Sequence, residues 1–544
     1  MTEIFDYVVI GAGSAGSVLA GRLSESGQYH VCVLEAGGSD RTPLVQCPAG
    51  IVAVAKSKRM NWGMETVPQA GLEGRKGFQP RGKVLGGSSS VNAMIYLRGQ
   101  PQDYDDWAAE GNPGWAWEDV KPWFLKAQHQ ARGADDFHAQ GGPLHVADLQ
   151  QPNPLSFDFV AAGMQAGYAH NRDFNGLSQE GVGLYQVTQK NGERCSAAKA
   201  YLWPHMQRSN LSVRTGAQVL RIVLKTTHTG LRATGVEYVR HGVRHIVHAR
   251  REVLLSAGAL LSPHILMCSG IGPAEHLQAL GVAVQHHLPG VGCNLQDHLD
   301  AILVCNAPRL KQSFGLSPSG AMHMARGAWH WHTARAGVLT TNFAEGGAFL
   351  RSSPEQARPD LQLHFVVGKL LDHGRKTVWG HGFSCHVCVL RPQSRGTVRL
   401  RSADPLSVPA IDPNFLAHLD DLQRTVRGVQ IMRHILAQPA LARHGAQELP
   451  ASAAAQSPAQ IAQWVRQTAD TIYHPVGTCR MGPRDTDVVD SQLRGHGVQG
   501  LRVVDASIFP RIISGNTNAP TIMVAEKASH LVLVAAQERT SAMA

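Results

Sequence analysis

A glycine-rich turn between a buried strand and a helix constrains this chain more than any other feature. The β-branched run 5–10 predicts a strand, and the segment 11–16, with glycine at its first, third and last positions, follows at once. Residues 17–26 have helical composition, and a second apolar run, 31–34, ends at Glu35. Together they predict a βαβ unit, the start of a doubly wound, Rossmann-like α/β domain that binds a dinucleotide.

The glycines and the carboxylate have separate physical roles in such a unit. Gly11 permits the sharp turn, Gly13 lets a pyrophosphate approach the backbone, and Gly16 lets the helix pack on the strand. The helix N-terminus offers N–H groups and a positive dipole end to the phosphates, and the carboxylate accepts hydrogen bonds from ribose hydroxyls. The expected cofactor contacts of the unit are Gly11, Gly13, Ser14, Ala15, Gly16, Glu35 and Ala36.

Composition and charge narrow the class of protein. A length of 544 residues predicts two domains, and 43% hydrophobic with 17% charged residues is typical of a soluble globular protein. The net charge is +10, but the basic residues are scattered and match no nucleic-acid motif, so we expect no nucleic-acid partner. A basic soluble enzyme is the simpler interpretation, and a peripheral attraction to an anionic membrane face is the alternative.

Cysteine usage and the absence of targeting signals favour an intracellular, cytoplasmic protein with reduced thiols. The chain has nine cysteines, which do not form a small disulfide framework. Cys385 and Cys388 form a lone CxxC in an apolar run, and because zinc needs more ligands we expect strand residues and no metal site. We find no cationic signal-peptide start and no run of the ~20 apolar residues that span a bilayer.

The pattern of strands and helices predicts two interleaved domains. Further strands are expected over 214–224, 235–239 and 246–256, the last two joined by a turn at His241–Gly242. A strand over 501–505 followed by a helix over 519–531 predicts a return to the first sheet. We therefore expect a dinucleotide-binding domain over 4–300, completed by 470–544, and a mainly substrate-binding domain over 301–469, with strands at 361–367, 383–390 and 397–400 and a helix at 420–436.

Five segments, in chain order, resemble signatures of the glucose–methanol–choline (GMC) oxidoreductase family, and the likeness covers nearly the whole chain. The family implies an FAD-binding Rossmann-like domain with an interleaved α+β substrate-binding domain on an antiparallel sheet. The segments are Arg81–Gly99 (RGKVLGGSSSVNAMIYLRG), Gly258–Pro273 (GALLSPHILMCSGIGP), Tyr473–Gly482 (YHPVGTCRMG), Val503–Ser507 (VVDAS) and Gly515–Pro520 (GNTNAP).

The resemblance also implies how FAD is held. Gly86 and Gly87 let backbone press against a flat ring system, and the serines at 88–90 offer polar groups to phosphate and flavin oxygens. Trp62 resembles a residue near the adenine, although a packing role fits it equally well. The FAD contacts implied beyond the βαβ unit are Trp62, Arg81, Val84, Leu85, Gly87, Ser88, Asn92, Ala93, Met94, Ile95, Val219, Asp505, Ala506 and Thr517.

One departure from the family pattern concerns the attachment of FAD. Some members, including choline oxidase, tether the flavin through a histidine at the position that matches Val91. A valine side chain has no nucleophile for that bond. We therefore expect FAD to be bound non-covalently.

The catalytic pair implied by the family motifs is His474 and Asn518. Alcohol oxidation removes a hydroxyl proton and a hydride, and histidine accepts a proton near neutral pH. Asparagine can both donate and accept hydrogen bonds, so it orients a hydroxyl without changing charge. Flavin takes the hydride, and the protein supplies geometry and electrostatics.

Several stretches resemble one branch of the family, the alcohol dehydrogenases of bacterial alkane degradation. That branch oxidises medium-chain primary alcohols, passes electrons to quinones and associates with the inner face of the cytoplasmic membrane. Choline dehydrogenase and an alcohol or aryl-alcohol oxidase that makes hydrogen peroxide are the redox alternatives, and an FAD-containing hydroxynitrile lyase is the non-redox one. The stretches are 159–164, 173–176, 181–192 and 371–376.

Two further features bear on the substrate, and the oligomeric state stays open. Glu345 resembles the carboxylate of choline-oxidising relatives, but the alkanol branch carries glutamate there as well, so it does not discriminate between them. The segment 322–331, rich in methionine and tryptophan, is either a lip of the substrate pocket that meets an alkyl tail or a membrane, or a helix that packs on its neighbour.

Overall fold

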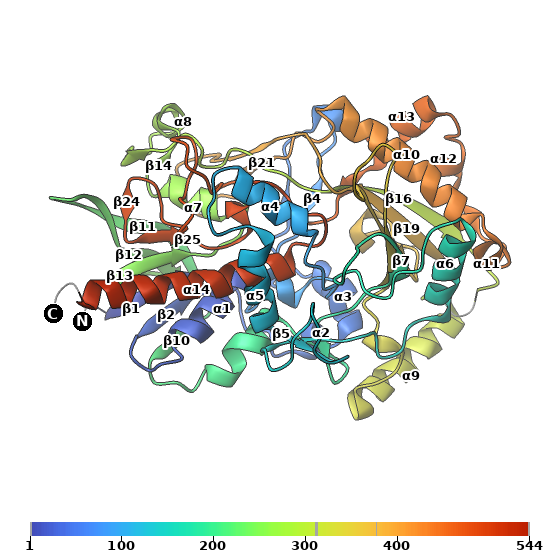
Figure 1. The fold of residues 1–544 in the computed structure, drawn as a ribbon, viewed down its shortest axis with the longest axis horizontal. Helices are drawn as coiled ribbons and strands as arrows, with labels where there is room; N and C mark the ends of the chain where they lie inside the picture. The colour runs from blue at the N-terminus through green and yellow to red at the C-terminus, as the bar shows by residue number, and fades with distance from the viewer. Residues whose placement is uncertain (1–2, 311–313, 377, 542–544) are drawn as a thin grey trace.

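The computed structural model describes residues 3–310, 314–376 and 378–541. Two sheets lie beside one another, each covered by its own helices (Figure 1). Each sheet has its own large hydrophobic cluster. The architecture matches the expected α/β dinucleotide-binding fold with an interleaved α+β part on an antiparallel sheet.

Within the described residues the first sheet has eight strands, and its centre is parallel. β1 lies between β2 and β13 and is parallel to both, and β25 is parallel to β13, so the C-terminal part returns to the sheet as predicted. β11, β12 and β13 form an antiparallel meander whose second turn is the predicted one at His241–Gly242. The strands are β10 (Leu211–Arg214), β2 (Val31–Leu34), β1 (Glu3–Ile10), β13 (Val243–Leu255), β12 (Gly230–Arg240), β11 (Ala217–Thr227), β24 (Val498–Gln499) and β25 (Leu501–Val503).

The strand predicted over 214–224 is present from Ala217 on, but its predicted start is wrong because the chain turns there. β10 ends at Arg214 and pairs with β2, whereas β11 begins at Ala217 and pairs with β12. Gly216 lies between them with φ +66°, a left-handed conformation that glycine adopts without a Cβ penalty. Apolar residues lie on both sides of the turn, so Gly216 is the one residue in the sequence that marks the boundary between the two strands.

The long C-terminal helix α14 (Asn518–Ser541) belongs to the core of the first part. It packs against α1 (Ser14–Leu23) and α5 (Trp117–Ala127) (Figure 1). Its segment Asn518–Glu538 is long and apolar enough to cross a membrane, but 72% of its most apolar window is buried inside the protein. Glu526 in its middle is fully buried and accepts from Arg22 of α1 and from the Tyr201 hydroxyl, which satisfies the charge inside the core.

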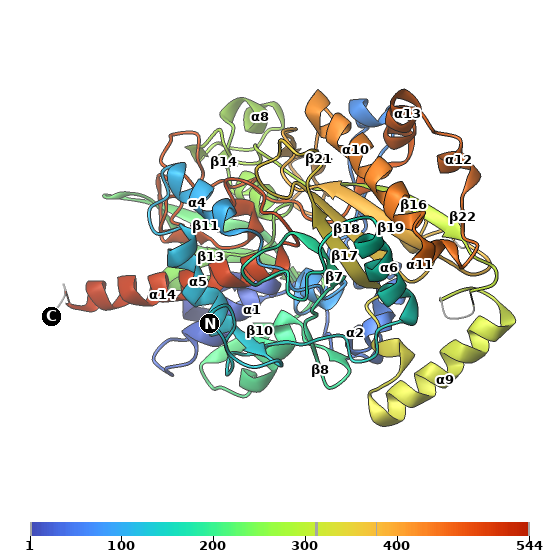
Figure 2. The same ribbon diagram turned by 45° about the vertical axis from the view of Figure 1, so that its right-hand side comes forward.

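The second sheet is antiparallel throughout and has seven strands among the described residues. Helices α6 (Pro154–Gln165), α10 (Leu419–Leu436) and α13 (Pro458–Thr468) cover one face (Figure 2). β7 comes from within the range expected for the first domain, so the domain boundaries stay a prediction. The strands are β22 (Gln447–Glu448), β16 (Leu299–Asn306), β19 (Gly382–Val389), β18 (Leu361–Val366), β17 (Ala344–Leu350), β7 (Gly181–Leu184) and β23 (Asp470–Thr471).

The alternation of side chains along β16, β18 and β19 separates a core from a cavity wall. One face carries apolar residues such as Leu303, Leu363 and Phe365, which pack against the helices. The opposite face carries Asp300, His364 and His386, and these line a cavity. Cys385 and Cys388, the lone CxxC, are strand residues of β19 as expected. The face of this sheet that is not packed against the helices therefore carries polar side chains of the functional site.

We predict that Phe365→Ala destabilises the second core strongly. Phe365 is fully buried and stacks between Phe159 at 4.6 Å and Phe383 at 5.2 Å between ring centroids. Loss of a buried phenylalanine costs about 3–5 kcal/mol, so the apparent Tm should fall by several degrees at a fixed scan rate. The matched control Leu177→Ala alters a side chain that is 90% exposed and should leave Tm unchanged. Equal Tm values for the two variants would contradict this assignment of the core.

Candidate active site

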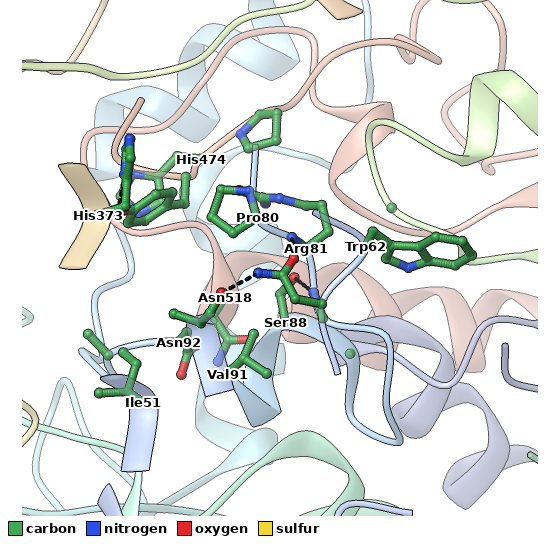
Figure 3. A pocket seen from close by; sticks show the side chains of 18 of the residues that line it. Ile51, Trp62, Pro80, Arg81, Ser88, Val91, Asn92, His373, His474 and Asn518 are labelled. Atoms are coloured by element: carbon green, nitrogen blue, oxygen red, sulfur yellow. Dashed lines mark hydrogen bonds between the residues drawn. The ribbon is translucent and has the colours of Figure 1, made fainter. Parts of the chain in front are cut away.

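A cavity of about 770 Å³ lies between the two sheets and is lined from both. Its volume is within the ~300–1,000 Å³ range of small-molecule sites. Figure 3 shows His474 and His373 at one end and Trp62 at the other, with Arg81, Ser88 and Val91 between them. The cavity is thus an elongated site that joins the glycine-rich turn to the polar wall of the second sheet.

The glycine-rich turn has the geometry that a bound dinucleotide requires. Gly11 has φ +92°, and a Cβ there would stand 2.6 Å from the carbonyl oxygen of Ser256, so no other residue fits. Helix α1 begins after Gly13, and no side chain caps its N-terminus. A Cβ on Gly87 would lie 2.8 Å from the Cα of Gly13, so the two glycine segments touch at the cavity. Backbone N–H groups at this point can meet phosphate oxygens directly.

Glu35 lines the cavity with its carboxylate held by backbone groups. One oxygen accepts from the N–H of Ala12 at 2.9 Å and the other from the N–H of Gly37 at 2.7 Å. Burial raises the pKa of the Glu35 carboxyl to about 7, and the two N–H donors oppose that shift. The carboxylate is thereby fixed at the place where a ribose would lie.

Arg81 is a buried cation whose partners are incomplete. Its Nε and Nη2 atoms are buried and make no hydrogen bond to the described part of the protein. Burial lowers the pKa of its guanidinium to about 10, and Asp297 opposes that shift. Since buried charged donors are almost always paired, this guanidinium fits a ligand with oxygen atoms in the middle of the cavity. The site is therefore compatible with FAD.

Most of the predicted cofactor contacts lie on the cavity wall, and three do not. Gly16 supports the turn from behind, because a Cβ there would meet the Gly11 carbonyl oxygen at 1.8 Å. Val84 and Leu85 are buried and do not line the cavity, and the N–H of Leu85 donates to the carbonyl of Gly38, so their contact with the cofactor stays a prediction. The predicted residues that line the cavity are Gly11, Gly13, Ser14, Ala15, Glu35, Ala36, Trp62, Arg81, Gly87, Ser88, Asn92, Ala93, Met94, Ile95, Val219, Asp505, Ala506 and Thr517.

His474 lies at the other end of the cavity between two hydrogen-bond partners. Its Nε2 atom is 3.0 Å from the side-chain nitrogen of Asn516, and its Nδ1 atom is 3.0 Å from Nδ1 of His298. Its own backbone N–H donates to Asp297 at 2.8 Å, which fixes the turn that carries it. Burial first, and then the imidazoles of His298 and His364, lower the pKa of His474 well below its ordinary value. It is therefore neutral at pH 7 and able to accept a proton.

The asparagine that contacts His474 in this structure is Asn516, not the predicted Asn518. Asn518 also lines the cavity, at the start of α14, but its side-chain oxygen accepts from the Ser14 hydroxyl at 2.8 Å. Asn518 thus links α14 to the glycine-rich turn. Both asparagines remain within the cavity wall near the histidine.

Sequence reasoning missed the polar wall that faces His474. Asp300 and His386 lie on β16 and β19, and their oxygen and Nδ1 atoms are 2.6 Å apart. The second carboxylate oxygen of Asp300 and Nε2 of His386 are buried without a partner among the described residues. Part of the signal was present in the sequence: polar residues occupy alternate places at 362 and 364 and at 384 and 386 in otherwise apolar runs, and Asp300 is a lone acidic residue in the apolar run 299–305.

The predicted contact between Glu345 and the substrate stays a prediction. Glu345 is fully buried and does not line the cavity. Its carboxylate accepts from the backbone N–H of Asn153 and from the hydroxyls of Ser156 and Thr341, at 2.6–2.8 Å. It therefore ties β17 to the start of α6, whereas Asp300 of the same sheet lines the cavity.

A dinucleotide-binding turn and a buried neutral histidine at opposite ends of one cavity define a cofactor-dependent enzyme. Models of the GMC oxidoreductase family match residues 5–300 and 392–525. The chain belongs to the GMC oxidoreductase family, as its motifs predicted, and the family implies FAD as cofactor.

Individual relatives span the full chain. An alcohol dehydrogenase [acceptor] of Pseudomonas putida is 45% identical over 97% of this chain and 96% of its own length. A mitochondrial choline dehydrogenase of Homo sapiens is 44% identical over 97% of this chain and 89% of its own. The crystal structure of pyridoxine 4-oxidase from Mesorbium loti has a TM-score of 0.85 and 31% identity over 97% and 99% of the two chains. The fold and the class of oxidoreductase acting on CH–OH groups follow from these likenesses.

We predict that Glu35→Gln weakens FAD binding by about 10- to 100-fold. The amide places an N–H₂ group against one of two backbone N–H donors, which costs about 1–3 kcal/mol. Titration of the apoprotein with FAD, followed by flavin fluorescence, measures the Kd. Glu65→Gln, at an exposed position of β3 (Met64–Glu65), is the matched control. An unchanged Kd in Glu35→Gln would remove Glu35 from the cofactor site.

Proposed function

We propose that this protein oxidises a primary alcohol to the aldehyde, with His474 as the base. The observation that carries the proposal is a neutral, buried histidine whose Nε2 faces the same cavity as the dinucleotide-binding turn. Bound FAD supplies the hydride acceptor for the reaction. General-base catalysis of this kind contributes about 10²- to 10⁴-fold to the rate.

The residues around His474 have distinct tasks in this proposal. Nε2 of His474 takes the hydroxyl proton as the O–H bond breaks, which makes the carbinol carbon a better hydride donor. Asn516 and Asn518 line the cavity beside it and orient the hydroxyl oxygen with their amide groups. The surrounding protein excludes water, since His474 is only 6% exposed.

A medium-chain aliphatic alcohol is the proposed substrate. The cavity wall beyond His474 carries apolar side chains from the second sheet and the adjoining loops, which suit an alkyl chain. On the same wall Nδ1 of His386 lies 2.6 Å from a carboxylate oxygen of Asp300. The apolar residues are Phe314, Leu316, Phe343, Val366, Leu370 and Val378.

Choline is the second candidate, and one observation favours it. Asp300 presents to the cavity a buried carboxylate oxygen that has no partner in the described part of the chain, and a quaternary ammonium ion would be attracted by a negative charge there. Choline dehydrogenases are among the relatives that span the chain.

We further propose a quinone-type acceptor and a cytoplasmic protein in peripheral contact with the inner face of the membrane. Helix α9 (Pro318–Ala334), which contains the methionine- and tryptophan-rich segment, extends along the edge of the molecule (Figure 2). It exposes Met322 at 57% and Trp329 at 71%, while Met324 lines the cavity. The segment 301–344 contains no acidic residue, so it suits an anionic surface.

We predict that 1-octanol bleaches the flavin of the purified protein under anaerobic conditions and that choline and benzyl alcohol bleach it more slowly. The bleached state should persist until a quinone is added, because the proposed acceptor is not oxygen. Stopped-flow absorbance of the flavin measures each rate. Faster bleaching by choline would replace the substrate assignment, rapid reoxidation by air would indicate an oxidase, and no bleaching by any alcohol would support the lyase.

His474→Gln should lower the rate of this bleaching by about 10²- to 10⁴-fold while FAD stays bound, since the glutamine cannot accept the proton. His228→Gln, at an exposed turn position, is the matched control and should behave as the unmodified protein does. An unchanged rate in His474→Gln would exclude His474 as the base.

We also propose that FAD is held without a covalent bond, since Val91 lines the cavity at the position of the tethering histidine. Precipitation of the yellow protein with acid should therefore release all flavin into the supernatant, measured by its absorbance. Flavin that stays with the washed pellet would contradict this proposal.

A further inference from the structure

His474 is one member of a chain of hydrogen bonds that ends on a backbone carbonyl group at each side. At one end the Tyr185 hydroxyl donates to the carbonyl of Leu363 at 2.6 Å. At the other end Nε2 of His298 lies 2.9 Å from the carbonyl oxygen of Leu390. Between them lie Gln362, Asn516 and His474, all in contact through their side chains.

The carbonyl group of Leu390 fixes the proton on His298. A carbonyl oxygen only accepts, so Nε2 of His298 carries the hydrogen and donates it. His298 is fully buried, and burial lowers its pKa to about 4, so it holds one proton at neutral pH. Its Nδ1 atom is therefore bare and acts as an acceptor.

The bare Nδ1 of His298 in turn fixes the proton on His474. The two Nδ1 atoms are 3.0 Å apart, and one of them must donate. Since His298 cannot, His474 carries its hydrogen on Nδ1. His474 is also neutral, so its Nε2 is bare and directed toward Asn516 and the cavity.

The other end of this series of hydrogen bonds, at Tyr185, requires the same tautomer of His474 by a separate argument. The Tyr185 hydroxyl donates to a carbonyl, so it accepts from the amide nitrogen of Gln362 at 3.2 Å. The same nitrogen donates to the side-chain oxygen of Asn516 at 3.0 Å. Asn516 then directs its own N–H₂ group at Nε2 of His474, which must be an acceptor. The other tautomer of His474 would set two donors against each other.

We propose that His298 is a positioning residue that holds His474 in the Nδ1–H tautomer, so that Nε2 faces the cavity as a ready proton acceptor. The inference rests on the proposed function for its role in catalysis. The proton balance is simple: the alcohol O–H bond breaks, an Nε2–H bond forms on His474, and the hydride leaves the carbinol carbon for FAD. The Nδ1–H bond to His298 stays in place throughout, whereas the amide of Asn516, which donates to Nε2 in this structure, has to turn away when the alcohol hydroxyl takes its place.

Two substitutions of His298 separate positioning from mere packing. In His298→Leu the acceptor is absent, so His474 loses its preferred tautomer and the anaerobic rate of flavin reduction should fall about 10- to 100-fold. In His298→Asp a carboxylate accepts from Nδ1 of His474 and raises its pKa. The rate should then be retained at high pH and lost as the pH falls through that raised value, so the acid limb moves to higher pH than in the unmodified protein.

The titratable and charged groups that face the pair are Asp297, His364, Arg81 and Arg391, and they are unchanged in both variants. His138→Leu is the matched control, because it also replaces a buried, hydrogen-bonded histidine but lies outside the cavity wall. It should alter neither the rate nor the profile. The proposal would be overturned if folded His298→Leu reduced its flavin at the rate, and with the pH profile, of the unmodified protein. It would also be overturned if both His298 variants lost the same fraction of the rate and neither shifted the pH profile.

A direct readout needs neither an alcohol nor a folded His298 variant. Long-range ¹⁵N–¹H correlation NMR of the ¹⁵N-histidine-labelled holoenzyme distinguishes protonated from bare ring nitrogens, and His474→Gln identifies the signals of His474 by their loss. A protonated Nδ1 and a bare Nε2 are expected, and the reverse would overturn the tautomer assignment. If no alcohol reduces the flavin, the proposed function fails while this spectrum still decides the tautomer.

Discussion

Two neutral imidazoles, those of His298 and His474, are joined by one hydrogen bond where the two sheets meet, and the rest of the site is arranged around that bond. His298 precedes β16 of the second sheet, and His474 follows β23 of the same sheet. A charge on either ring would be costly in a buried place, since desolvation disfavours the ionised form. The site therefore keeps both rings neutral and uses backbone carbonyls, which cannot change their polarity, to direct the hydrogens.

The parts of the site that could be predicted from sequence are those set by local backbone geometry. The glycines of the first turn and Glu35 are separated by few residues, and their roles follow from a strand, a turn and a helix in succession. Gly11 and Glu35 lie where the motif requires them, against Ser256 and the N–H groups of Ala12 and Gly37. Family motifs placed His474 in the cavity because they mark a fixed loop in a fixed fold.

The parts that could not be predicted depend on which segments meet in space. Asp300 and His386 stand 86 positions apart in the chain, and the register of β16 with β19 brings them together. The sequence does not show which of Asn516 and Asn518 places its amide against His474, because the conformation of the turn before α14 decides this. Glu345 lies in a strand whose neighbours line the cavity, but its side chain contacts the start of α6, and a resemblance in sequence does not show this.

The two-faced second sheet has a consequence for how this enzyme can change its substrate. Because side chains alternate along β16, β18 and β19, the cavity wall and the hydrophobic core occupy different positions of the same strands. Point substitutions at 300, 364 or 386 alter the pocket while leaving the core packing against the helices in place. Insertion or deletion of a single residue within these strands would exchange the two faces. Natural or laboratory selection can therefore change the pocket by substitution at a small set of positions, while the lengths of these strands have to stay the same.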